Sequence, residues 1–114
     1  MYTMSNNRLD MITEMLVKNP EDTFLNYAAA LEHKKRNKPK KAITIFKKIV
    51  NMDPDYLATY YQLGKLLEEV GKTEEAIEVY KRGRELAKKT KDVKAMGELS
   101  EALMILDEGD GIAF

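Results

Sequence analysis

The sequence has no cysteine, and this absence excludes several classes of protein. A disulfide framework, a thiolate zinc site and a cysteine nucleophile all require this residue. A reducing cytoplasm is the natural environment for a chain without disulfides, so we expect a cytoplasmic protein.

Long apolar runs are also missing. The first residues, MYTMSNNRLD, lack the basic segment and apolar run of a signal peptide, and no later run approaches the length of a membrane span. Lysine plus arginine (19) equals aspartate plus glutamate (19), so the net charge favours neither nucleic acid nor a membrane as partner. We expect no membrane association.

Catalytic residues are scarce too. The single histidine, His33, has no second histidine or cysteine with which to bind a metal, and no Ser-His-acid arrangement is visible. The glycines do not form a phosphate-binding loop. Acid pairs such as Glu68-Glu69 are most simply solvated charge at helix ends. We therefore predict that the protein is not an enzyme and has no cofactor and no metal.

Residues that break helices are few. Proline occurs only at positions 20, 39 and 54, whereas alanine, leucine, glutamate and lysine dominate. Apolar residues make up 44% and charged residues 33%, which is typical of a soluble globular protein. High helix propensity along almost the whole chain predicts an all-α fold.

An internal repeat of 34 residues organises the sequence. A shift by this length, without gaps, places aromatic residues on aromatic ones and small residues on small ones. The identical or similar pairs are Pro20/Pro54, Tyr27/Tyr61, Ala30/Gly64, Lys38/Lys72, Ala42/Ala76, Ile43/Ile77, Phe46/Tyr80 and Lys47/Lys81.

The second copy of this repeat resembles the tetratricopeptide repeat family, and in particular small stand-alone bacterial proteins of that family. The family pattern is W-x₂-L-G-x₂-Y, then A-x₃-F, then P. The matching positions hold Tyr60, Leu63, Gly64, Leu67, Ala76, Tyr80 and Lys88, with Tyr60, Leu67 and Lys88 departing from the pattern. The first copy keeps Ala42, Phe46 and Pro54 but has Asn26, Ala29, Ala30 and His33 in its earlier places. His33 thus falls at a packing position, where a satisfied or half-buried imidazole is the ordinary outcome.

The resemblance implies an α-solenoid of antiparallel helix pairs forming a right-handed superhelix. Each repeat consists of a first and a second helix. A shift of 36 residues aligns the C-terminal stretch with the first helix of the second repeat, so this stretch is expected to form one more first helix. An apolar stripe before Pro20 resembles a second helix without its own first helix. We expect six helices near residues 7–18, 21–36, 39–52, 55–70, 73–89 and 92–107. In one domain, residues 1–19 form a flanking helix, 20–53 and 54–88 two repeats, 89–108 a capping helix and 109–114 a tail. About three helix pairs are needed for stability, and two full pairs with two flanking half-pairs meet this requirement, so we expect a complete array.

Local signals support these boundaries. Asn7 and Thr73 suit the capping position before a helix, and Pro39 suits a first helical turn. Glu74 and Glu75 are favourable near a helix N-terminus. Residues able to adopt a left-handed conformation stand just past three helix ends: Asn37, Gly71 and Gly109.

The family resemblance also implies a function. First helices of such arrays line a concave surface, so we expect a non-catalytic protein–protein interaction module that holds a peptide or protein segment there. The candidate groove residues are Phe24, Tyr27, Leu31, Lys34, Tyr61, Gln62 and Lys65, with Ala58, Glu68, Lys94, Gly97, Glu101 and Met104 beside them. Equally, Tyr27 and Tyr61 could simply pack between neighbouring first helices. The basic clamp that one subfamily uses for chaperone tails is missing, because Tyr27 and Leu31 occupy two of its positions.

The distribution of charge along the chain suggests alternatives to this function. Residues 34–48 include eight basic residues and no acid, while Lys34, Lys35, Lys40 and Lys41 become Glu68, Glu69, Glu74 and Glu75 one repeat later. Pairing between stacked repeats, binding of an acidic partner or nucleic acid by the Lys34–Lys48 surface, and self-association of copies are all compatible with this pattern. Nucleic acid is disfavoured because aromatic residues are not interleaved with the basic run. We expect the protein to be a monomer or a weak homo-oligomer.

The C-terminal GDGIAF segment admits two interpretations. Ile112 and Phe114 could cover the apolar face of the last helix or enter a neighbouring molecule, or the terminus could fray.

Overall fold

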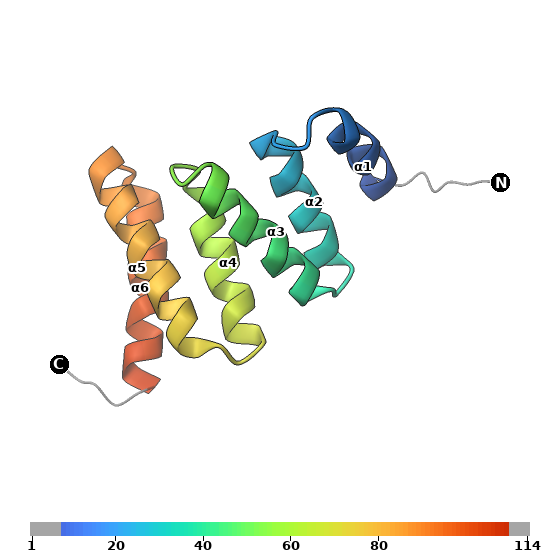
Figure 1. The fold of residues 1–114 in the computed structure, drawn as a ribbon. Coiled ribbons are helices and arrows are strands. Elements are labelled where there is room, and N and C mark those ends of the chain that lie inside the picture. Colours follow the sequence, from blue (N-terminus) through green and yellow to red (C-terminus); the bar gives the residue numbers. More distant parts are fainter. Residues whose placement is uncertain (1–7, 110–114) are drawn as a thin grey trace. The chain divides into compact units, whose positions relative to one another are not determined.

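A computed structural model describes residues 8–109 of the chain, and every regular element within this range is a helix. The six helices are α1 (Arg8–Lys18), α2 (Thr23–Lys35), α3 (Pro39–Met52), α4 (Ala58–Glu69), α5 (Thr73–Thr90) and α6 (Val93–Gly109). The predicted all-α fold of tetratricopeptide-like helix pairs is confirmed (Figure 1). The proposals for Asn7 and for residues 110–114 of the tail concern positions outside the described residues.

The helix ends follow from local chemistry. Asp22 precedes α2, and its Oδ1 accepts a hydrogen bond from the amide of Leu25 at 2.9 Å. Pro39 is the first residue of α3, as predicted. Asn37 and Gly71 adopt left-handed conformations with φ of 62° and 83°, which lets the chain leave α2 and α4 sharply.

Two predictions about residues at helix termini are wrong: the cap at the start of α5 and the residue after α6. Thr73 is the first residue of α5, while the capping position belongs to Lys72, whose side chain makes no capping hydrogen bond. Gly109 is the last residue of α6 and does not lie beyond it. The left-handed residue that ends α5 is instead Lys91, with φ of 62°.

The chain divides into two compact units. Unit 1 ends at Tyr56 and contains α1, α2 and α3; unit 2 begins at Leu57 and contains α4, α5 and α6. Within each unit, helices that follow one another in the sequence pack together (Figure 1).

The core of unit 1 lies between α2 and its two neighbours. Phe46 and Ile49 of α3 are fully buried, and Ala30 of α2 leaves room for this helix to approach. On the other side of α2, Ile12 of α1 packs against Ala28 and Ala29. This arrangement makes α2 the central helix of the unit.

One carboxylate is buried in unit 1. Glu32 is only 8% exposed, and its oxygens lie 3.2 Å from Arg8 Nε and 3.9 Å from Arg36 Nε. A buried charge is tolerated only with such partners, so this cluster ties α1 to the end of α2.

The core of unit 2 depends on two glycines that face tyrosine rings. A Cβ atom built on Gly64 of α4 would lie 2.2 Å from Cε1 of Tyr80, so only glycine lets this ring approach the helix. Gly83 of α5 faces Tyr60 in the same manner, with 2.6 Å between its would-be Cβ and the Tyr60 Cβ. The Tyr80 hydroxyl donates a hydrogen bond to Glu68, and burial together with this carboxylate raises the pKa of Tyr80.

Candidate partner-binding groove

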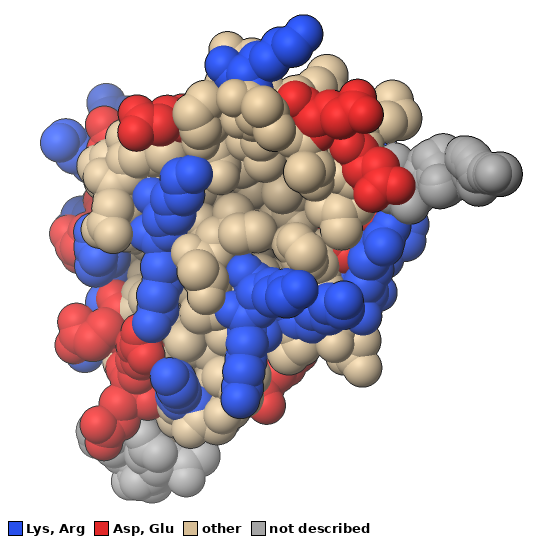
Figure 2. Space-filling view, turned by 45° about the vertical axis from the view of Figure 1, so that its right-hand side comes forward, with Lys and Arg blue, Asp and Glu red and all other residues tan. Residues whose placement is uncertain are grey.

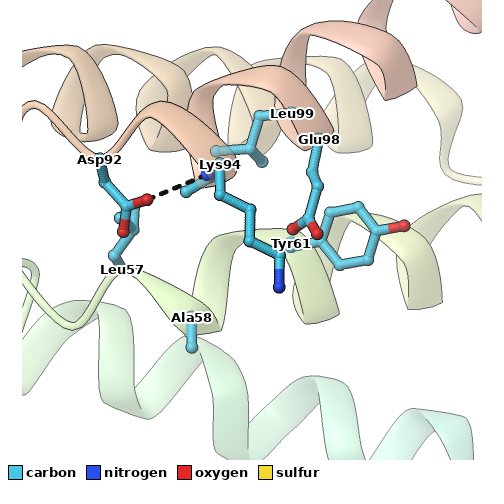
Figure 3. Close-up of a pocket in the computed structure, with 8 residues that line it drawn as sticks. Leu57, Ala58, Tyr61, Asp92, Lys94, Glu98 and Leu99 are labelled. Carbon is cyan, nitrogen blue, oxygen red and sulfur yellow. Dashed lines mark hydrogen bonds between the residues drawn. The ribbon is translucent and has the colours of Figure 1, made fainter.

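Unit 2 contains a hollow of about 240 Å³ between α4 and α6. Both are first helices by their position in the repeat. Its lining comes from these two helices and the residues just before them: Leu57, Ala58, Tyr61, Asp92, Lys94, Ala95, Glu98 and Leu99 (Figure 3). We call this hollow the α4–α6 groove.

Helical spacing brings the lining residues together. Leu57 and Ala58, at the start of α4, stand four and three positions before Tyr61, so all three lie on one side of this helix. Glu98 and Leu99 likewise stand three and four positions after Ala95 on α6. Asp92 fixes the start of α6, because its Oδ1 accepts a hydrogen bond from the amide of Ala95 at 3.0 Å (Figure 3). The small side chains of Ala58 and Ala95 leave the hollow open.

Tyr61 is the one aromatic residue that lines the groove. Its ring centroid lies 6.3 Å from that of Tyr80 with the planes inclined by 45°, and Lys65 Nζ lies 5.9 Å from the Tyr61 centroid. These contacts hold the half-buried ring in place on the groove wall.

Charged groups of both signs surround the apolar interior. Leu99, only 1% exposed, contributes buried apolar surface, while Lys94 and Glu98 are exposed. Figure 3 shows the Glu98 carboxylate beside the Tyr61 ring and the Lys94 side chain extending across the hollow. An ammonium and a carboxylate next to an aromatic wall can orient a bound polypeptide through hydrogen bonds and ion pairs.

The predicted residues of unit 2 are only partly at this groove. Tyr61, Ala58 and Lys94 line it, whereas Gln62 and Lys65 are on α4 without lining it. Glu68, Gly97, Glu101 and Met104 also lie outside the lining. Sequence reasoning missed the other five lining residues: Leu57, Asp92, Ala95, Glu98 and Leu99.

The predicted residues of unit 1 have varied surroundings. Phe24 is 66% exposed, while Leu31 and Lys34 are half-buried. Tyr27 packs edge-on against Phe46 at 5.6 Å and against Tyr56 at 5.4 Å between ring centroids. Tyr27 is therefore a packing residue within its own unit.

His33 is half-buried, as its repeat position predicts, but it is not fully satisfied. Its Nδ1 is buried without a hydrogen-bond partner among the described residues. Burial lowers the pKa of His33, and the charges of Lys41, Lys38 and Arg36 lower it further.

No group of three or more histidine, aspartate or glutamate side chains among the described residues is arranged to hold a metal ion. No helix in this part of the chain is long and apolar enough to cross a membrane.

Comparison with known proteins places the chain among proteins of the same architecture. A crystal structure of a tetratricopeptide repeat domain protein from Salinibacter ruber is 39% identical with a TM-score of 0.73, covering 76% of this chain and 97% of that one. A solution structure of such a domain protein from the same organism is 40% identical with a TM-score of 0.74, covering 78% and 90%. A protein from Bordetella parapertussis shares the fold at 20% identity and a TM-score of 0.81, covering 93% of this chain and 92% of that one.

The search among curated proteins found no match. A family model described as tetratricopeptide repeat matches residues 33–98, which is more than half of the sequence. With this match and a relative 39% identical over most of its length, the chain belongs to the tetratricopeptide repeat family.

Proposed function

We propose that the protein is a non-catalytic interaction module that binds a peptide or protein segment in the α4–α6 groove. The observation that carries this proposal is an open hollow between two first helices with Tyr61 held on its wall. Aromatic residues at such places recur as binding anchors because they bury a large area and lose little entropy.

The lining favours a partner side chain with an apolar body. Ala58, Ala95 and Leu99 offer an apolar surface that such a side chain would cover. Lys94 and Glu98 would then contact backbone or charged groups of the same segment. The lining contains no histidine, serine or threonine, and we propose that it binds a segment without chemical change.

In unit 1 we propose a second contact surface on α2. Phe24 is the exposed aromatic residue of this helix, and Leu31 and Lys34 lie about two and three turns further along it. Tyr27 supports this surface from within, through its contacts with Phe46 and Tyr56.

The test uses peptides selected against the intact protein from a random display library. The dissociation constants of the best binders are measured by fluorescence anisotropy for the wild type and for Tyr61→Ala. Loss of a buried aromatic anchor costs about 2 kcal/mol or more, so we expect binding to weaken about thirtyfold.

The matched control is Glu85→Ala, because Glu85 is exposed on the second helix α5 and does not line the groove. It should leave the affinity unchanged. If Tyr61→Ala binds the selected peptides as the wild type does while remaining folded, the site is elsewhere and the proposal fails.

A further inference from the structure

A second surface with its own chemistry lies at the corner between α2 and α3. Lys35 ends α2 and Pro39 begins α3, so Lys35, Lys38, Lys40 and Lys41 are gathered at one sharp turn of the chain. We call these four exposed residues the basic turn. Figure 2 shows lysine and arginine side chains lying side by side toward the lower right of the viewed face.

The charge of the basic turn is not neutralised. Among residues 8–109, none of its four ammonium groups forms a hydrogen bond or an ion pair. Glu32 is the nearest acid in sequence, but it is buried and already contacts Arg8 and Arg36. The basic turn therefore presents a positive potential to solvent.

This positive potential acts on a neighbouring titratable group, His33. The charges of Lys41, Lys38 and Arg36 all act on His33 in the sense that opposes its protonation, in addition to the effect of burial. Arg36 and Lys38 of the connecting turn and Lys41 of α3 thus act together at one place, and the carboxylate of Glu32 on α2 acts in the opposite sense.

Helix stability explains only one of these four lysines. Cations are favourable near a helix C-terminus, which accounts for Lys35 in the last turn of α2. Lys40 and Lys41 are in the first turn of α3, where the helix dipole disfavours cations and where no acid is present. At the same repeat positions, α5 has the favourable pair Glu74 and Glu75. Lys40 and Lys41 thus make an unfavourable contribution to the stability of α3, which points to a role in binding.

We propose that the basic turn binds a short acidic segment of a partner protein, rich in aspartate and glutamate. Its carboxylates would make charge-assisted hydrogen bonds with the four ammonium groups. A nucleic acid fits less well, because the single aromatic residue between positions 34 and 48, Phe46, is fully buried and offers no ring for base stacking. This surface does not share any residue with the α4–α6 groove.

The test measures the binding of a fluorescein-labelled peptide of eight glutamates to the full-length protein by anisotropy. Attraction between exposed charges is screened by salt, so the affinity of the wild type should fall severalfold between about 50 mM and 200 mM salt. Lys40→Glu/Lys41→Glu reverses two of the four charges and should weaken binding at least about tenfold at the lower salt. Because this change gives α3 the acids that α5 already has, its thermal midpoint should not fall.

Two controls make the result specific. Lys88→Glu/Lys89→Glu alters the net charge equally on α5 and should leave the affinity for the glutamate peptide within about twofold of wild type. Tyr61→Ala should bind this peptide normally, which separates the basic turn from the groove. The milder pair Lys40→Gln/Lys41→Gln should show an intermediate affinity.

Three outcomes would overturn the proposal. The wild type could fail to bind the glutamate peptide at low salt, or both charge-reversed variants could lose affinity equally. Tighter binding of a single-stranded oligouridine or of phosphatidylserine vesicles than of the glutamate peptide would assign the basic turn to another class of partner.

Discussion

Replacing Gly64 by alanine tests the packing of unit 2 most sharply. The new methyl group would lie 2.2, 2.6 and 2.7 Å from Cε1, Cδ1 and Cζ of Tyr80, far inside van der Waals contact. Tyr80 is fully buried and its hydroxyl is hydrogen-bonded to Glu68, so the ring has nowhere to move. Either the ring or the α4 backbone must shift, and the packing between α4 and α5 is lost in part.

Two opposing effects set the magnitude. Overpacking a core typically costs about 1–3 kcal/mol, and the rigidity of this ring places Gly64→Ala near the upper end. Alanine in a helix interior gains about 1 kcal/mol over glycine. The expected net loss in the free energy of unfolding is therefore about 2 kcal/mol. At roughly 4 °C per kcal/mol for a chain of this size, the thermal midpoint should fall by about 8 °C.

The assay is thermal unfolding followed by circular dichroism, with Gly97→Ala as the matched control. Gly97 lies inside α6, and apart from its chain neighbours and the nearby backbone of that helix no atom is within 4 Å of its would-be Cβ. The same substitution there should raise stability by about 0.5–1 kcal/mol, because only the helix propensity changes. A Gly64→Ala variant as stable as Gly97→Ala would refute the close approach of Tyr80 to α4.

Three further predictions concern other parts of the fold. Asp22→Ala should cost about 1 kcal/mol of stability in urea unfolding, because it removes the cap of α2, whereas Thr73→Ala should cost less than about half as much, since Thr73 is not a cap. Gly83→Ala should destabilise by about 1–3 kcal/mol in the same assay, since its methyl group would meet Tyr60. The folded state holds the pKa of His33 below 6.5, so the unfolded chain binds more protons and the free energy of unfolding falls as pH drops below about 6.5. His33→Gln should reduce the fall in the urea midpoint between about pH 7.5 and 5.5, and an unchanged fall would contradict this origin.

Most of the core could be predicted from the sequence because the repeat places equivalent residues at equivalent positions. Ile12, Phe46 and Tyr80 are spaced by 34 residues, and all three are buried on second helices. The pairing of small residues with aromatic ones, as in Gly64 and Tyr80, likewise follows from the family pattern.

Local structure without a sequence signal could not be predicted. Lysine has no preference for the left-handed conformation, so nothing marked Lys91 as the end of α5. The start of α4 was placed too early because Tyr56 forms a turn, in which its amide donates to the Asp53 carbonyl at 3.0 Å and its ring packs on Tyr27.

The lining of the α4–α6 groove overlaps only in part with the groove residues expected from the sequence. The expected stripe on α6 contained Lys94, Gly97 and Glu101, whereas Ala95 and Glu98 line the groove beside Lys94. The difference is a rotation of the helix about its axis. Packing against α4 and α5 determines that rotation, and the hydrophobic pattern fixes it only to within about one residue.

The most direct test of the α4–α6 groove is an NMR titration of the ¹⁵N-labelled protein with a selected peptide. If the peptide binds there, amide shifts should be largest for Leu57, Tyr61, Ala95, Glu98 and Leu99, and Tyr61→Ala should abolish them. Shifts confined to the outer side of α5, around Lys81 and Glu85, would contradict the proposed site.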